Sequence, residues 1–133
     1  MSGSRWIFVM VAALSVAVGC SDDTTGAPAR PGTLSLTLTT PHADDGAMLF
    51  EVSGPSIDSA IAVNASLRLF TRLVNGSTVV GAVVGALANG AVVNLQVPDV
   101  GVAAEYTARV LEVADRKDAL RASLAGYALT VDP

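Results

Sequence analysis

In the second quarter of the chain, apolar and polar residues begin to alternate in short runs, and this period of two predicts β-strands. The clearest run, TLSLTLTT at residues 33–40, alternates leucine with serine and threonine. The run AMLFEVSG at residues 47–54 places Met48, Phe50 and Val52 in phase. Because successive side chains of a strand point to opposite faces, each run predicts one buried face and one solvated face.

Further runs continue this pattern along the rest of the chain. They lie at residues 57–63, 66–74, 104–115 and 126–132, and the first of them is weak. Two more apolar segments, residues 77–88 and 91–99, flank Asn89-Gly90. Asn-Gly tolerates the positive φ angles of a type I′ turn, so this dipeptide predicts a β-hairpin between the two segments.

A two-residue turn fixes the register of the predicted hairpin. One face is then wholly apolar and consists of Ala82, Val84, Ala86, Ala88, Ala91, Val93, Leu95 and Val97. The opposite face is mixed and is expected to be partly wet, with Gly81, Val83, Gly85, Leu87, Val92, Asn94 and Gln96. A slip of one residue would exchange the two faces, so the pattern specifies the pairing.

Seven or eight short strands in about 100 residues favour a β-sandwich of immunoglobulin-like architecture. The likeness is architectural only, because the Cys-Trp-Cys core of true immunoglobulins is absent from this sequence, and a small barrel is the alternative. Apolar residues make up 51% of the chain and charged residues 15%, a composition typical of folded rather than disordered chains. We therefore expect one all-β domain, a single sandwich, at residues 33–133.

The start of the chain differs from the alternating runs, because its apolar residues are continuous. MSGSR supplies a short basic beginning, and WIFVMVAALSVAV at residues 6–18 is apolar except for Ser15. This order is typical of a secretory signal peptide, which we predict at residues 1–19. A transmembrane helix is the competing interpretation, but it needs about 20 apolar residues, and Gly19 and the polar residues after it end the run sooner.

Ala17, Val18, Gly19 and Cys20 end this segment, and Cys20 is the one cysteine of the chain. These residues resemble the lipobox of bacterial lipoproteins, in which small residues precede an invariant cysteine. The resemblance implies cleavage between Gly19 and Cys20, a diacylglycerol on the Cys20 thiol, and anchoring to a membrane that faces the periplasm or the exterior. It covers residues 1–20 alone, and the family usually has leucine where this chain has Ala17.

Other fates of this segment remain open. Ala17 and Gly19 also satisfy the small-x-small rule of ordinary signal cleavage, which would release a soluble protein, and an uncleaved anchor is a third alternative. In enterobacterial lipoproteins an aspartate directly after the cysteine resembles an inner-membrane retention signal, so Ser21 favours delivery to an outer membrane if the organism has one. Residues 20–32 contain Gly, Pro, Thr and Asp and predict a lipid-anchored flexible linker.

The chain offers little catalytic chemistry. Its formal net charge is −4 and it has no basic patch, which gives no support to nucleic-acid binding. His42 is the one histidine, in a turn sequence beside Asp44 and Asp45, where solvated side chains are expected. The lack of metal-ligand clusters and of a glycine-rich phosphate loop predicts no metal site and no cofactor, and weak calcium binding by the acidic pairs in loops stays open as an alternative. We expect no catalytic residue and a protein that is not an enzyme.

One run contains a candidate contact surface. In SLRLFTRLV, residues 66–74, Phe70 shares a face with Arg68 and Arg72, opposite three leucines. Arginine and aromatic residues are enriched at the centres of protein interfaces, so this strip is the best candidate for binding a partner. The alternative is that another strand or loop covers Phe70.

These features favour a membrane-anchored cell-envelope lipoprotein whose domain is a non-catalytic binding, adhesion or structural module. Its partners would be the membrane, through Cys20, and a protein or a glycan. Two other classes stay open, namely a small envelope hydrolase that uses His42 and a secreted carbohydrate-binding module. Loss of activity in a His42→Ala variant would favour the hydrolase, and binding to a glycan array would favour the carbohydrate-binding module.

Overall fold

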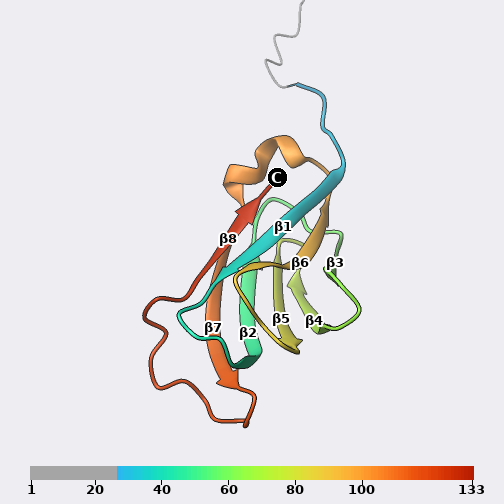
Figure 1. Cartoon of the computed structure of the whole chain (residues 1–133). Helices are drawn as coiled ribbons and strands as arrows, with labels where there is room; N and C mark the ends of the chain where they lie inside the picture. Colours follow the sequence, from blue (N-terminus) through green and yellow to red (C-terminus); the bar gives the residue numbers. More distant parts are fainter. Residues whose placement is uncertain (1–26) are drawn as a thin grey trace, which may run out of the picture.

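The computed structural model describes residues 27–133, so the predicted signal peptide, Cys20 and most of the predicted linker lie outside the described residues. The domain is all-β, and every predicted run contains a strand (Figure 1). The elements are β1 (Gly32–Thr39), β2 (Asp45–Ser53), β3 (Ser59–Ala62), β4 (Arg68–Asn75), β5 (Thr78–Val84), β6 (Gly90–Val97), the 3₁₀ helix η1 (Val100–Glu105), β7 (Thr107–Asp115) and β8 (Ala128–Asp132). No helix in this part of the chain has the length and apolar character that crossing a membrane requires.

The strands form two four-stranded antiparallel sheets that pack against each other as a sandwich, which confirms the predicted fold class. The strand order is β3-β6-β1-β8 in the first, sheet A, and β4-β5-β2-β7 in the second, sheet B. Figure 1 shows β1, β6 and β8 in front of β2 and β7. Among the strands of residues 27–133, only the consecutive pair β4 and β5 shares a sheet, so each of the other connections between these strands crosses between the sheets.

The core lies between the two sheets and takes alternate residues from their central strands. As predicted, it includes Leu34, Leu36 and Leu38 from β1 and Met48, Phe50 and Val52 from β2. It also includes Val93, Leu95 and Val97 from β6, which the hairpin pattern placed on one apolar face. A shift of β1 by one residue would bury serine and threonine in place of leucine, so this core fixes the phase of the strand.

The predicted Asn-Gly hairpin is wrong, because β5 and β6 lie in different sheets. After β5 the chain turns at Gly85, whose φ of +145° favours glycine, and Leu87 then enters the core. The Leu87 N–H donates to the carbonyl oxygen of Asp45 at 3.1 Å. The Asn89 Oδ1 accepts a hydrogen bond from the Thr40 N–H at 2.7 Å. Asn89 therefore holds the crossing segment to the end of β1 instead of closing a hairpin.

The faces of β5 are also the reverse of those expected. Its buried residues are Val79, Gly81 and Val83, while the opposite face of the strand has Val80, Ala82 and Val84. Gly81 lies against the ring of Phe50, and a Cβ built on Gly81 would be 2.5 Å from the Phe50 Cζ. The missing side chain at position 81 thus makes room for a fully buried aromatic ring.

The chain that leads into β1 is held against the sandwich near η1. The Asp99 Oδ1 accepts hydrogen bonds from the N–H groups of Gly101 at 2.8 Å and Arg30 at 3.2 Å. The Val100 N–H donates to the Arg30 carbonyl oxygen at 2.8 Å. The last residues of the predicted linker are therefore bonded to the domain, and β1 begins at Gly32, one residue before the predicted boundary.

The variant Gly81→Ala should lower the free energy of unfolding by about 1–3 kcal/mol, because its Cβ must displace the Phe50 ring within a packed core. Denaturant unfolding of the variant and the parent protein measures this difference. Gly76→Ala is the matched control, since a Cβ on Gly76 would meet nothing within 4 Å, and it should change stability by less than about 0.5 kcal/mol. Equal effects of the two substitutions would contradict the packing of Gly81 against Phe50.

Candidate functional site

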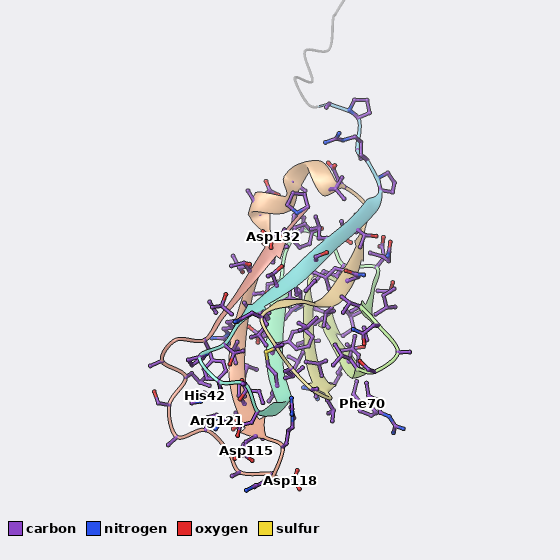
Figure 2. The ribbon with its side chains drawn as sticks, viewed as in Figure 1. His42, Phe70, Asp115, Asp118, Arg121 and Asp132 are labelled. Atoms are coloured by element: carbon purple, nitrogen blue, oxygen red, sulfur yellow. The ribbon has the colours of Figure 1, made fainter. Side chains whose placement is uncertain are left out.

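The predicted contact strip lies on β4, an edge strand of sheet B. Arg68, Phe70 and Arg72 are all exposed, and 61% of Phe70 is accessible to solvent. Their direct neighbours on β5 are Val84, Ala82 and Val80. Figure 2 shows Phe70 on the other side of the domain from His42 and Arg121. Phe70 is therefore not covered by another strand or loop of residues 27–133.

The strip continues into an apolar area on the outer face of sheet B. The two central strands contribute small and aliphatic residues to this face, namely Ala47, Leu49, Val80, Ala82 and Val84, and one charged residue, Glu51, which lies opposite Val80. On its far side, Glu112 of β7 lies opposite Leu49. Leu120 from the loop between β7 and β8 is 67% exposed and lines a shallow pocket with Leu49 and Glu112. The outer face of sheet B thus has an apolar area around Leu49 and Ala82, and this area meets charged residues on β2, β4 and β7.

Charged side chains border this face on both sides. Arg68 and Arg72 lie along β4, and Glu112 is exposed on β7. Beside Glu112, the Nη2 of Arg109 pairs with the Oε1 of Glu51 at 3.0 Å. Within residues 27–133, Arg68, Arg72 and Glu112 form no ion pair. The face therefore has two arginines without an ion pair on β4, an ion pair between β2 and β7, and an acidic group without an ion pair on β7.

The outer face of sheet A has a different character. The Gln96 Nε2 donates to the Thr33 Oγ1 at 3.0 Å, and the Ser35 Oγ donates to the Asn94 Oδ1 at 3.2 Å. Such hydroxyl and amide groups bond to each other across strands and remain compatible with water. The apolar outer face is therefore a property of sheet B and not of the sandwich in general.

A second group of functional side chains, the Asp45 cluster, consists of Asp45, Thr40, Asp44, Arg121 and Tyr127. Figure 2 shows Arg121 at the end of the domain opposite the start of β1. Asp45 is the first residue of β2, and its side chain is fully buried. Its carboxylate accepts hydrogen bonds from the Thr40 and Tyr127 hydroxyls and, at 2.8 and 3.0 Å, from the Arg121 guanidinium. The Arg121 Nη2 also lies 2.6 Å from the Asp44 Oδ1. The cluster therefore joins the loop between β1 and β2 to the loop between β7 and β8.

These contacts set the charges within the Asp45 cluster. Burial acts to raise the pKa of Asp45, but hydrogen bonds from Thr40, Arg121 and Tyr127 outweigh it, so this pKa lies below its ordinary value. The hydrogen bonds to Asp45 and Asp44 raise the pKa of the Arg121 guanidinium further above its usual range. Burial raises the pKa of the Tyr127 hydroxyl. Asp45 is therefore an ionised carboxylate whose charge Arg121 balances.

His42 is exposed in the loop between β1 and β2, and its ring lies 5.9 Å from the ring of Tyr127. A serine-hydrolase arrangement needs a histidine oriented by a carboxylate and facing a nucleophile. The carboxylates nearest in sequence, Asp44 and Asp45, instead bind Arg121, and the Thr40 hydroxyl donates to Asp45. No three His, Cys, Asp or Glu side chains of residues 27–133 are grouped to hold a metal ion.

A scan against models of protein families found no match, and searches of the curated proteins and of the solved structures found no similar protein. Gly19 and Cys20, the predicted cleavage and lipidation site, lie outside the described residues. The choice of function therefore depends on the sequence of the first twenty residues and on the surfaces of the domain.

The expectation that Asp44 and Asp45 belong to a solvated turn is wrong for Asp45, which is buried at the start of β2. Its partner Arg121 is 76 residues away in sequence, within DRKDALRA, a segment whose charge predicts a solvated crossover. No local pattern connects the two residues, because only the crossing of the chain between sheets brings them together. The one sequence signal for this cluster is Tyr127, which is in phase with apolar residues and is therefore expected to be buried. A buried tyrosine hydroxyl usually has a hydrogen-bond partner.

The variant Asp45→Ala should lower the free energy of unfolding at neutral pH by about 3 kcal/mol, because it removes one partner of a buried ion pair and leaves Tyr127 and Thr40 without their acceptor. Denaturant unfolding measures the loss. The exposed carboxyl of Asp132 supplies the control, and Asp132→Ala should change stability by less than about 0.5 kcal/mol.

The same carboxyl should make stability depend on pH. The pKa of Asp45 in the folded state lies below its value of about 3.9 in the unfolded state, so unfolding takes up a proton in acid. The stabilisation is complete above the unfolded pKa and is lost as the pH falls through the folded pKa. Unfolding curves recorded from neutral to acidic pH should show a flatter decline for Asp45→Asn than for the parent protein. Parallel declines in acid would contradict this assignment.

Proposed function

We propose that this protein is a membrane-anchored cell-envelope lipoprotein whose β-sandwich is a non-catalytic binding, adhesion or structural module. Cleavage between Gly19 and Cys20 leaves Cys20 at the new amino terminus with a diacylglycerol on its thiol. Two acyl chains give stable anchoring, because each buried methylene contributes about 0.8 kcal/mol. The observation that carries the anchor is the single cysteine at the end of an apolar signal segment. The membrane faces the periplasm or the exterior, and Ser21 favours an outer membrane.

The outer face of sheet B supports a binding role for the domain. Contiguous exposed apolar patches usually mark interaction sites, and this one has Phe70 between two arginines at its border. The chain enters the domain at the end where β1 begins (Figure 1), and the apolar area around Leu49 and Ala82 lies on the outer face of sheet B, which faces away from sheet A. A tether attached at that end leaves the face open to a partner in the envelope.

The Asp45 cluster supports a role without catalysis. Both oxygens of the Asp45 carboxylate accept hydrogen bonds, and Arg121 balances its charge. A general base or a nucleophile needs a free lone pair within reach of a substrate. Asp45 is instead well placed to hold the loops at this end of the sandwich in position.

The anchor can be tested by the intact mass of the protein purified from the membranes of its own host. The expected mass is that of a chain beginning at Cys20 plus a diacylglycerol, because the lipobox directs both modifications to this residue. The variant Cys20→Ala should be neither processed nor retained in the membrane. Ser21→Ala, which changes the adjacent residue and keeps the thiol, should have the parent's modification and location.

An unmodified chain in the soluble fraction would contradict the proposed lipid anchor on Cys20. The protein would then be a secreted β-sandwich with a free thiol near its amino terminus. The binding role of sheet B does not depend on this outcome, since it comes from the surface of the domain.

A further inference from the structure

The edge of β4 is the longest strand edge that the described part of the chain leaves open. β4 has eight residues and ends sheet B on one side, and within this part its backbone hydrogen bonds go to β5 alone. β3 and β8, the edge strands of sheet A, have four and five residues. The edge of β7 is partly covered, because the Val113 carbonyl oxygen accepts the Arg121 N–H at 2.8 Å. An open edge presents unpaired N–H and C=O groups to which a further strand can bond.

The backbone hydrogen bonds of β5 show which groups of β4 point outward. At the two ends of the ladder between β2 and β5, the Gly85 N–H donates to the Gly46 carbonyl oxygen and the Gly54 N–H donates to the Ser77 carbonyl oxygen, both at 2.9 Å. Bonded and non-bonded residue pairs alternate along an antiparallel ladder. The odd-numbered residues of β5 therefore bond to β2, and its even-numbered residues bond to β4.

The two sides of β4 follow from this register. Arg68, Phe70 and Arg72 lie opposite even-numbered residues of β5, so their backbone groups bond within sheet B. The residues between and after them turn their N–H and C=O groups away from β5, and their side chains lie on the core side of the sheet. An added strand would bond to the backbone of these residues, which are Leu69, Thr71 and Leu73.

The core side of β4 has space for the side chains of an added strand. Thr71 and Leu73 lie opposite buried residues of β5 but are exposed, and 57% of Leu73 is accessible to solvent. β3 and β4 lie at the same edge of the sandwich (Figure 1), and a pocket of about 240 Å³ opens between them. Asp58 is its one charged lining residue and disfavours an acidic side chain there. The apolar lining residues are Ile57, Ala60, Leu73 and Val79.

The outer side of the same strand is positively charged. Arg68 and Arg72 are exposed and form no ion pair with another residue of 27–133, and Phe70 lies between them. The acidic residue in the row of Arg72 on this face, Glu51, pairs with Arg109. The charge of the two arginines is therefore open to a ligand with acidic groups at the same spacing.

We propose that β4 binds an extended peptide of another protein, which adds an antiparallel fifth strand to sheet B. Main-chain hydrogen bonds give affinity in such strand addition, and alternate side chains give specificity. The peptide has acidic residues four positions apart beside Arg68 and Arg72, and apolar residues on the side of the pocket between β3 and β4. The inference rests on the contact surface of the proposed function and names the chemistry of its partner.

A second copy of β4 is a poorer occupant of this edge. When two β4 strands pair about a two-fold axis, the same residues of both copies lie on the same face. Arg68 and Arg72 of one copy then lie directly or diagonally opposite those of the other, for an axis at any residue from 68 to 72. Like charges at such positions destabilise a pair of strands.

The probe is the synthetic peptide VEVYVEV, blocked at both ends and labelled with a fluorophore. Its glutamates match Arg68 and Arg72, its tyrosine matches Phe70, and its valines point to the pocket side. VKVYVKV is the matched control. Fluorescence anisotropy with the full chain, purified from the fraction in which the host places it, should show VEVYVEV binding at least about tenfold more tightly than VKVYVKV, because like charges replace opposite ones at two positions.

Backbone pairing is tested by removing a hydrogen-bond donor. The Thr71 N–H points away from β5, and proline is tolerated at such positions of edge strands, so Thr71→Pro should fold as the parent does. It should bind VEVYVEV at least about tenfold more weakly, because one hydrogen bond is lost and a peptide carbonyl is left without its donor. Thr71→Ala keeps the N–H and should bind as the parent does. N-methylation of the two central valines of the peptide should weaken binding similarly and leaves the protein unchanged.

Charge reversal tests the preference for acidic residues. The variant with Arg68→Glu and Arg72→Glu should bind VKVYVKV more tightly than VEVYVEV. Circular dichroism and thermal unfolding establish that each variant is folded. A parent protein that binds neither peptide, or both equally, overturns the inference. Binding that depends on the arginines but not on N-methylation of the peptide also overturns strand addition, and it would keep a binding role for the strip. The mass at Cys20, measured on the same sample, tests the anchor separately.

Discussion

The core shared by the two sheets is the constraint on which the rest of the molecule depends. Sheet A contributes leucines and valines from β1 and β6, and sheet B contributes Met48, Phe50 and Val52 from β2. Neither sheet has a second layer on its outer side within the described residues, so each buries its apolar face only against the other. Since β4 and β5 are the one hairpin among the eight described strands, neither sheet can assemble from one continuous piece of residues 27–133.

The crossings between sheets explain why a charge lies buried at one end of the sandwich. Three crossing segments meet where β2 begins, and their backbone and side-chain polar groups need partners away from water. The Asp45 carboxylate bonds Thr40 from one segment and Arg121 and Tyr127 from another, while its backbone carbonyl bonds Leu87 from the third. Buried charge is tolerated at this position because every bond that it needs is made.

The sequence predicts the strands and the core of β1, β2 and β6, because a period of two and a buried face are local properties. It does not predict which strands share a sheet. Asn89-Gly90 has the composition of a hairpin turn, but burial of Leu87 outweighs the local preference and sends the chain to the other sheet. The exposure of Phe70 follows from the alternation in β4, whereas the partnership of Asp45 with Arg121 depends on contacts across the whole domain. Local patterns therefore give the elements, and long-range packing decides how they join.

The pairing of β1 with both β6 and β8 has a consequence for how the protein folds. β1 is the first strand of residues 27–133, and its neighbours in sheet A are the sixth and the eighth. During synthesis from the amino end, β1 is made long before β6 and β8. Its three leucines, which are buried in the folded domain, stay exposed until then. Folds dominated by such distant pairings form slowly, because the entropy of closing a long loop is lost before the favourable contacts form. Sheet A therefore cannot be completed until Ala128–Asp132 of β8 are available, and β1 is paired on both sides only when β6 and β8 have joined it.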